Sequence, residues 1–181
     1  EAWYDKNNLK DYEKVIADTV WCNDKTNVTD TTFNPHGYSN VNGLGYGSKS
    51  TYYGATHRLV STGGSAGGTG PSLKCNGKLS KISSKVGLIT ADELALAGYA
   101  NGLQNTTTYL QENATDTWWW SLSPDNFSGR YAYVRGAGGS NGYFSSGSVD
   151  ITRGIRPSIS LKPSTNVTGD GTSSSPFVVK I

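Results

Sequence analysis

The chain has 181 residues, of which 35% are hydrophobic and 17% are charged. This length suits one folded domain, and the content of core-forming side chains excludes a disordered chain. The formal net charge of only +2, spread over scattered Lys and Arg residues, argues against nucleic acid as a partner. No stretch approaches the roughly 20 apolar residues that cross a bilayer, so no membrane insertion of this segment is expected.

The first 22 residues are expected to form a helical N-terminal region. Apolar side chains recur near helical spacing between Lys, Asp and Glu, and predict an amphipathic helix over about residues 5–18. They are Trp3, Leu9, Tyr12, Val15 and Ile16. Because the sequence begins abruptly at Glu1, we expect the natural chain to continue upstream into a linker, stalk or membrane anchor.

Two cysteines, Cys22 and Cys75, lie far apart without CxxC spacing or a nearby histidine pair, which argues against zinc and thioredoxin-like chemistry. A disulfide between them would close a loop of about 50 residues and needs an oxidising compartment. The alternative is two unpaired buried thiols in a cytosolic protein. We favour the disulfide and an extracellular or cell-surface location.

The stretch 23–71 is rich in Gly, Asn, Ser and Thr and predicts a long irregular excursion. Its GGSAG at residues 63–67 has the letters of a serine-nucleophile elbow but lacks the strand-turn-helix context. The two histidines, His36 and His57, have no metal-binding spacing. No catalytic residue is therefore predicted, and the chain is not expected to be an enzyme.

The segment VGLITADELALAGYA predicts a short strand followed by a helix of about eight residues. Thr90 and Glu93 have capping-box spacing, and Gly98 marks the end of the helix. Asp92 and Glu93 are adjacent and do not face each other on a helix, so they are interpreted as first-turn acids rather than a catalytic pair.

The last third predicts antiparallel strands. Tyr131, Tyr133 and Arg135 alternate with smaller apolar residues, and GAGGSNG supplies a turn. The segment 154–161 is predicted as another strand, in which Pro157 implies an edge position or a bulge. PFVVKI is expected to form a closing strand.

The order of VGLITADELALAG, WWWSLSP, AYVRG, GIRPSISL and GTSSSPFVV resembles a family of secreted bacterial domains with a C-type-lectin-like fold. These domains are related to formylglycine-generating-enzyme-like domains and to the variable proteins of diversity-generating retroelements. The resemblance is most specific over residues 86–181. It implies an α+β, C-type-lectin-like fold of short antiparallel strands, about two helices and long irregular loops, in a single domain spanning 1–181.

The sequence lacks the motifs by which members of the related families carry out their known chemistry. No cysteine follows Cys75, so formylglycine-generating activity is not expected. The Glu-Pro-Asn and Gln-Pro-Asp motifs of calcium-dependent sugar-binding lectins are missing from the sequence. No cofactor is predicted. A structural calcium ion is left open, because oxygen ligands exist without EF-hand spacing; they are Asp125, Asn126, Asp150 and Asp170.

The three consecutive tryptophans cannot all face inward from a strand, because neighbouring side chains alternate. Trp118 and Trp120 would share one side and Trp119 the other. One interpretation is that the cluster is core, and the other is that one Trp forms the floor of a recognition site. Arg156 precedes a proline and is interpreted as structural, bonding backbone carbonyls.

Between Asp125 and Thr152, recurring Tyr, Ser, Asn, Gly and Arg residues have the chemistry of an adaptable binding surface. The alternative is an ordinary polar hairpin. In retroelement-variable proteins, the corresponding stretch carries the diversified side chains, and the resemblance places exposed ligand-binding candidates here. Trp119 is included as the tryptophan that would form the floor of the site. The ligand-binding candidates are Trp119, Asn126, Arg130, Tyr133, Arg135, Asn141, Tyr143, Ser145, Ser146, Ser148 and Asp150.

The main functional hypothesis is a non-catalytic recognition domain, an adhesin or receptor-binding module that binds a protein or glycan. It would be displayed on a bacterial surface or on a pilus-like or phage-derived structure, and its surface would be open to retroelement diversification. The alternative is a structural module of a surface fibre or pilus. An enzyme acting on glycans or peptides is the weakest hypothesis.

Overall fold

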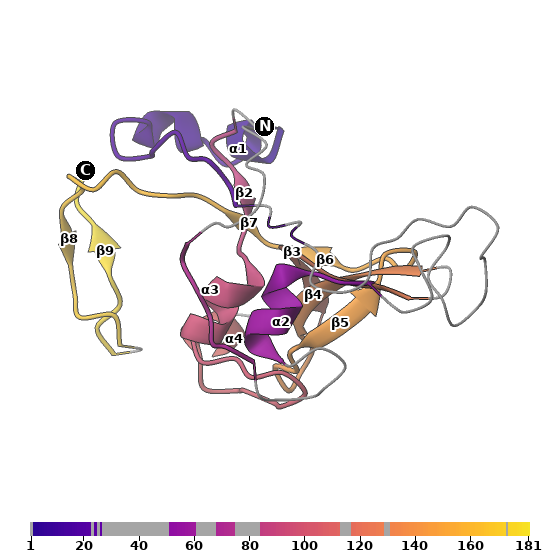
Figure 1. Cartoon of the computed structure of the whole chain (residues 1–181). Coiled ribbons are helices and arrows are strands. Elements are labelled where there is room, and N and C mark those ends of the chain that lie inside the picture. The colour runs from indigo at the N-terminus through magenta and orange to yellow at the C-terminus, as the bar shows by residue number, and fades with distance from the viewer. Residues whose placement is uncertain are drawn as a thin grey trace.

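A computed structural model describes residues 2–22, 24, 26, 51–60, 68–74, 84–112, 117–128, 131–172 and 174–181. It has the expected α+β character, with a few short helices and mainly antiparallel sheets (Figure 1). In this part of the chain, no helix is long and apolar enough to cross a membrane.

The main sheet is built on three antiparallel strands, β3 (Trp118–Ser128), β4 (Tyr131–Gly138) and β5 (Ser145–Ser148). Two short strands share the other edge of β3: β1 (Thr51–Tyr52) runs antiparallel to it and β6 (Gly154–Ile155) runs parallel. The strand predicted at Tyr131–Arg135 and the turn predicted after it are therefore confirmed, but burial does not alternate along β4: its first four residues are partly buried and its last four are buried.

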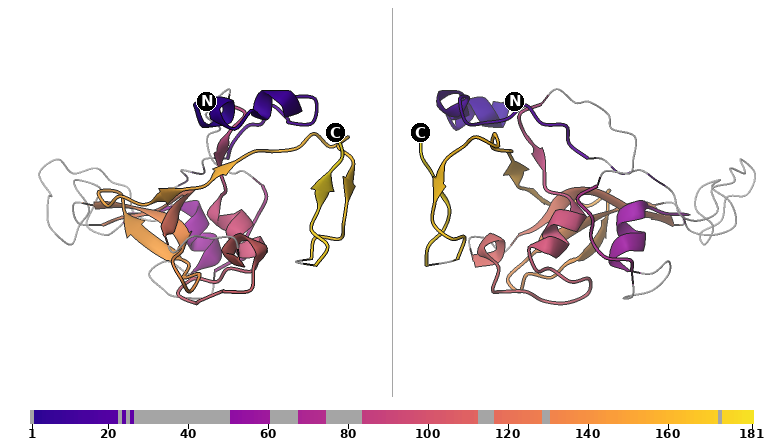
Figure 2. Two further views of the ribbon diagram at one scale, coloured as in Figure 1. Left: turned by 180° about the vertical axis from the view of Figure 1, so that it is seen from behind. Right: turned by 60° about the vertical axis from the view of Figure 1, so that its left-hand side comes forward.

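Three short helices lie on one face of this sheet (Figure 1): α2 (Gly54–Leu59), α3 (Ala91–Leu96) and α4 (Tyr109–Glu112). The core forms between them and the sheet, where burial of apolar side chains provides the main driving force for folding. Its buried members are Ala55, Ala91, Leu94, Tyr99, Trp119, Ala137 and Phe144. Seen from behind, the opposite face of the sheet carries none of these helices (Figure 2).

Helix α3 forms as the sequence predicts, although it is six residues long rather than eight. The Thr90 side chain accepts from the Glu93 N–H at 3.2 Å, and the Glu93 carboxylate accepts from the Thr90 N–H at 2.8 Å. This capping box satisfies two backbone donors that would otherwise lack helical partners. Gly98, at φ 100°, ends the helix in the left-handed region that glycine adopts without strain.

The N-terminal region is not the continuous helix predicted for residues 5–18. It contains α1 (Ala2–Lys6) and a separate 3₁₀ turn, η1 (Leu9–Tyr12). Asn8 lies between them at φ 53°, a left-handed conformation that interrupts a right-handed helix. The chain then pairs with the C-terminal part: the Ala17 N–H donates to the Ser160 carbonyl at 2.9 Å.

The strand predicted for 154–161 is divided. β6 pairs with β3, whereas β7 (Pro157–Ser158) pairs antiparallel with β2 (Gly87–Leu88) in a separate two-stranded sheet. Pro157 therefore lies in a strand with a single recorded neighbour in the described part of the chain, as expected of a residue without a backbone donor.

The closing segment forms a hairpin of β8 (Val167–Thr168) and β9 (Val178–Val179). This hairpin stands apart from the main sheet in all three views (Figures 1 and 2). PFVVKI thus contains the expected strand, but the strand pairs within the hairpin rather than with the main sheet.

Candidate binding site

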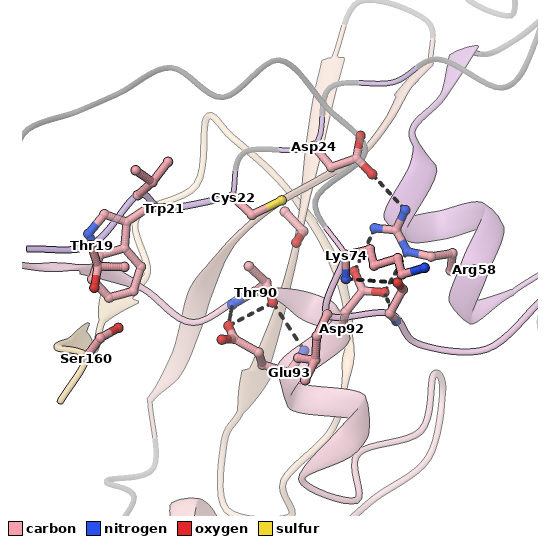
Figure 3. Close-up of a pocket in the computed structure, with 14 residues that line it drawn as sticks. Thr19, Trp21, Cys22, Asp24, Arg58, Lys74, Thr90, Asp92, Glu93 and Ser160 are labelled. Atoms are coloured by element: carbon pink, nitrogen blue, oxygen red, sulfur yellow. Dashed lines mark hydrogen bonds and ion pairs between the residues drawn. The ribbon is translucent and has the colours of Figure 1, made fainter. Parts of the chain in front are cut away.

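A partly buried arginine, Arg58, lies between two buried carboxylates and borders a small pocket (Figure 3). Arg58 on α2 donates from Nε and Nη2 to the two carboxylate oxygens of Asp92, at 2.6 and 2.8 Å. Its Nη1 donates to Asp24 at 2.7 Å. Asp92 also accepts from the Ser72 N–H at 2.9 Å. We call Asp24, Arg58 and Asp92 the arginine clamp.

The electrostatics of the arginine clamp favour its charged form. The hydrogen bonds that Arg58 donates to Asp92, and then to Asp24, raise the pKa of Arg58 above its usual value despite burial. Burial by itself would raise the pKa of Asp24, but hydrogen bonds from Arg58 and Thr26 outweigh it and leave that pKa below the ordinary value. Both carboxylates are therefore tied to a permanent cation, which makes the clamp a tertiary link between the Asp24 segment, α2 and α3.

Two pockets adjoin the arginine clamp. One, of about 210 Å³, is lined by residues 19–22, by Asp24 and by residues of α3 that include Glu93. The other, of about 420 Å³, is lined in part by His57, whose Nδ1 is buried without a hydrogen-bond partner. The first is smaller than the roughly 300–1,000 Å³ typical of small-molecule sites.

A second buried ion pair corrects the prediction that Arg135 is an exposed binding residue. Its side chain is 4% exposed and donates from Nη2 to Asp125 at 2.7 Å. Thr56 donates to the same carboxylate, and Arg135 also donates to Asn101. The pair lies on the helix-covered face, where Arg135 links β4 to β3.

The prediction that Trp119 forms the floor of a recognition site is also wrong. Trp119 is 2% exposed and belongs to the core between the sheet and the helices. The Arg156 guanidinium lies 5.1 Å from its ring centroid and donates to the Leu110 carbonyl at 2.6 Å. The structural role predicted for Arg156 is therefore confirmed.

The other predicted binding residues do not form one surface. Residues paired across antiparallel strands share a face, so Tyr133, Ser146 and Ser148 lie on the helix side of β4 and β5, and Ser145 lies on the opposite side. Asp150 is exposed and accepts from the Ser148 hydroxyl.

The remaining predicted residues are scattered further. Tyr143, 40% exposed, and Asn141 lie in the turn after β4, about 17 Å along that strand from Tyr133. Asn126, on β3, has a buried and unpartnered Oδ1. Arg130 lies outside the described residues.

The helix-free face of the sheet carries an aromatic cluster instead. Trp118 and Trp120 both point to this side, as predicted, and their rings meet edge to face with centroids 4.9 Å apart and an interplanar angle of 86°. Both are partly exposed. The rings reach over Gly136 and Gly147, where the missing side chains leave room for them.

Two further residues complete this surface. Ile155, 66% exposed, lies beside Trp120 in the parallel register with β6. The Arg153 guanidinium lies 5.2 Å from the centroid of the Trp118 ring. We call Trp118, Trp120, Arg153 and Ile155, together with their glycine floor, the aromatic face.

The four candidate calcium ligands are not gathered. Asp125 is buried against Arg135, Asp150 follows β5, and Asp170 lies in the C-terminal hairpin, where its carboxylate accepts from Thr172. Among the residues that the structure places, no three His, Cys, Asp or Glu side chains could hold a metal ion.

Cys22 lines the smaller pocket and is disulfide-bonded. Its predicted partner, Cys75, lies outside the described residues. The pairing of Cys22 with Cys75 therefore remains a prediction.

No protein-family model, curated protein or solved structure matches this chain. The resemblance to C-type-lectin-like domains stays a hypothesis.

The arginine clamp and Arg153 were not identified from the sequence as parts of a cluster. Asp92 carried one signal, its place in the first turn of a predicted helix, but nothing local links it to Asp24 or Arg58. The position of Arg153 over Trp118 depends on the parallel pairing of β6 with β3. Such contacts between distant segments leave no periodic pattern in a single sequence.

Proposed function

We propose that this chain is a non-catalytic binding domain, displayed outside the cell, that binds a protein or glycan ligand through the aromatic face. The tryptophan cluster keeps the recognition role considered for it, but that role moves from Trp119 to Trp118 and Trp120. The Tyr and Ser side chains of β4 and β5 are divided between the two faces of the sheet and are not the basis of this site.

One observation carries the proposal: two indole rings are partly exposed together on a sheet face that the described helices leave uncovered. Large rigid aromatic side chains lose little conformational entropy on binding, which is why they dominate recognition surfaces. Neither the Trp118 nor the Trp120 indole N–H has a recorded partner in the part of the chain that is described. Both can therefore donate to a ligand.

The buried acids support a non-catalytic role. A general acid or base must be able to exchange a proton with a bound substrate. Asp24 and Asp92 are held by Arg58, and Asp125 is held by Arg135 and Thr56. These carboxylates stabilise the fold through fixed ion pairs.

The test is a binding screen of the wild-type chain against a glycan array and a panel of purified extracellular proteins. Trp120→Ala should reduce binding of any captured ligand by tenfold or more, on the order expected for a recognition hot spot. Phe177→Ala, which removes a 63% exposed aromatic ring from the distant hairpin, is the matched control and should bind normally. Binding that survives Trp120→Ala unchanged would refute the assignment of this face.

The C-terminal hairpin favours a second candidate, a structural module of a surface fibre. Among the described strands, its two strands pair with each other and with no third one, and Phe177 and Val178 are 63% and 56% exposed. An isolated two-stranded hairpin is marginally stable, so packing against a neighbouring copy would stabilise it. Sedimentation velocity over a hundredfold concentration range should then show self-association that Phe177→Ser weakens; a monomer at every concentration would exclude this candidate.

A further inference from the structure

Arg153 presents an unused cation at the aromatic face. The residue is exposed, and its recorded contact is the stacking on Trp118 at 5.2 Å. Within the described part of the chain Arg153 makes no ion pair or hydrogen bond, whereas the three other described arginines bind carboxylates or a carbonyl. From this we infer that the aromatic face binds an acidic saccharide, with Arg153 holding the sugar carboxylate.

Stacking on Trp118 prepares Arg153 for this role. The ring attracts the guanidinium through its negative π face and restricts the motion of a long side chain. The planar fork then presents parallel N–H donors, which match the two oxygens of a carboxylate. Because the cation has no carboxylate partner among the described residues, none of the described ion pairs must break when the ligand binds.

The two rings favour a sugar over other carboxylates. Trp118 and Trp120 stand edge to face and almost perpendicular, at 86°, so their two ring planes meet at nearly a right angle. The C–H face of a pyranose ring is flat and apolar and can stack on one indole while its rim touches the other. Sugar hydroxyls would accept from the indole N–H groups and exchange hydrogen bonds with Ser145, which lies on the same side of the sheet.

The size of the aromatic face favours a saccharide over a folded protein. A stable protein interface buries about 800 Å² on each partner and is centred on a large apolar patch. Here the apolar part consists of two partly exposed indoles and Ile155 beside bare glycine backbone. One or two sugar units match that area.

This inference rests on the proposed function, and matched probes separate the two. The acidic probes are sialyllactose and a galacturonate oligosaccharide; their neutral counterparts are lactose and the methyl-esterified oligosaccharide. Affinity is measured by calorimetry, and the tryptophan indole N–H signals are followed by NMR. The acidic member of each pair should bind about tenfold or more tightly, as expected for hydrogen bonds to a charged group.

Variants assign the effect to Arg153. Arg153→Met should remove the preference for the acidic probe, and Arg153→Lys should keep only part of it, because an ammonium lacks the planar fork. Lys180→Met in the hairpin removes the same charge away from the face and should change nothing. Thermal melting controls for folding.

Three outcomes would overturn the inference. Equal binding of acidic and neutral sugars, lost in Trp120→Ala, would refute the role of Arg153 and leave the proposed function standing. Preference for a glutamate-rich peptide over both sugars would refute the ligand class. Absence of binding to either sugar pair would also refute it, and the proposed function would fail only if Trp120→Ala left every captured ligand bound.

Discussion

Trp118, Trp119 and Trp120 differ in role because a strand turns consecutive side chains to opposite faces. Trp119 fills the core under the helices, whereas its two neighbours lie on the helix-free side. The alternation was predictable from the sequence. Which face would be buried was not, because that depends on where α2 and α3 pack.

Asp92 is expected to be worth far more to stability than an ordinary surface acid. Asp92 is buried, and Asp92→Asn would leave the partly buried Arg58 cation with one carboxylate instead of two. Removing one partner of a buried ion pair costs about 3 kcal/mol. Urea denaturation should show this loss. Asp11→Asn, at an exposed position, should change the free energy of unfolding by less than about 0.5 kcal/mol; equal effects of the two substitutions would contradict the buried clamp.

The pKa of Asp24 predicts an acid-dependent loss of stability. Because hydrogen bonds hold this pKa below its ordinary value in the folded state, the unfolded chain binds more protons in the acidic range, and stability rises with pH there. The contribution is complete above the ordinary aspartate pKa of about 3.9 and is lost as the pH falls through the lower folded-state pKa.

Thermal melting between pH 7 and pH 2.5 tests this prediction. Asp24→Asn should lower the melting temperature at pH 7, and it should flatten the decline below about pH 4 relative to the wild type. A decline of unchanged steepness in the variant would assign the acid sensitivity to other carboxylates.

At the scale of elements, sequence patterns predicted a helix or strand correctly where the contacts that stabilise it lie within a few residues. The capping box and Gly98 define α3 through residues within one turn of its ends. The N-terminal periodicity failed because Asn8 adopts a left-handed conformation and the following segment pairs with residues 160–162 instead. The strand at 154–161 was divided for a similar reason, since its two halves find different partners.

Alanine substitutions at Gly136 and Gly147, the two glycines under the aromatic face, should destabilise the fold to different extents and so test the packing of β3, β4 and β5. A methyl group at Gly136 would overlap the Trp119 carbonyl oxygen and the Trp118 ring, whereas one at Gly147 would meet only ring atoms, at 3.1–3.3 Å. The Trp119 backbone cannot move aside without disturbing the strand, whereas a tryptophan ring can shift by a few tenths of an ångström. Gly136→Ala should therefore cost about 3 kcal/mol and Gly147→Ala less than about 1 kcal/mol, by urea denaturation. A larger loss for Gly147→Ala would contradict the observed strand register.

At the scale of the whole molecule, the local patterns predicted short strands and short helices, the resemblance implied an α+β chain, and the described part of the structure has that α+β character. The candidate site was predicted less well. Arg135 and Trp119 have the residue types of a binding surface but are buried. Arg135 is bound by Asn101, and Trp119 packs in one core with Ala55 and Leu94, all distant in sequence. Arg153 reaches Trp118 only through a parallel strand pairing. Exposure is a property of the assembled chain, and one sequence does not encode it locally.

The disulfide bears both on the stability of the fold and on the proposed extracellular location, because it needs an oxidising compartment. Cys22 is disulfide-bonded and lies two residues before Asp24 of the arginine clamp, and the chain has only two cysteines. A Cys22–Cys75 bond would restrict an unfolded loop of about 50 residues, worth about 4 kcal/mol on the loop-entropy model. Cys22→Ser should therefore lower the urea midpoint strongly, and a reductant should reproduce that shift in the wild type without affecting the variant.

Peptide mapping without reductant should recover Cys22 and Cys75 in one linked fragment. Alkylation of the native, unreduced chain should add no mass, since neither thiol would be free. Two added alkyl groups would instead mean reduced cysteines, as in a cytosolic protein, because structural disulfides persist in oxidising compartments. That result would remove the main physical argument for an extracellular binding domain, and the aromatic face would then need a ligand available inside the cell.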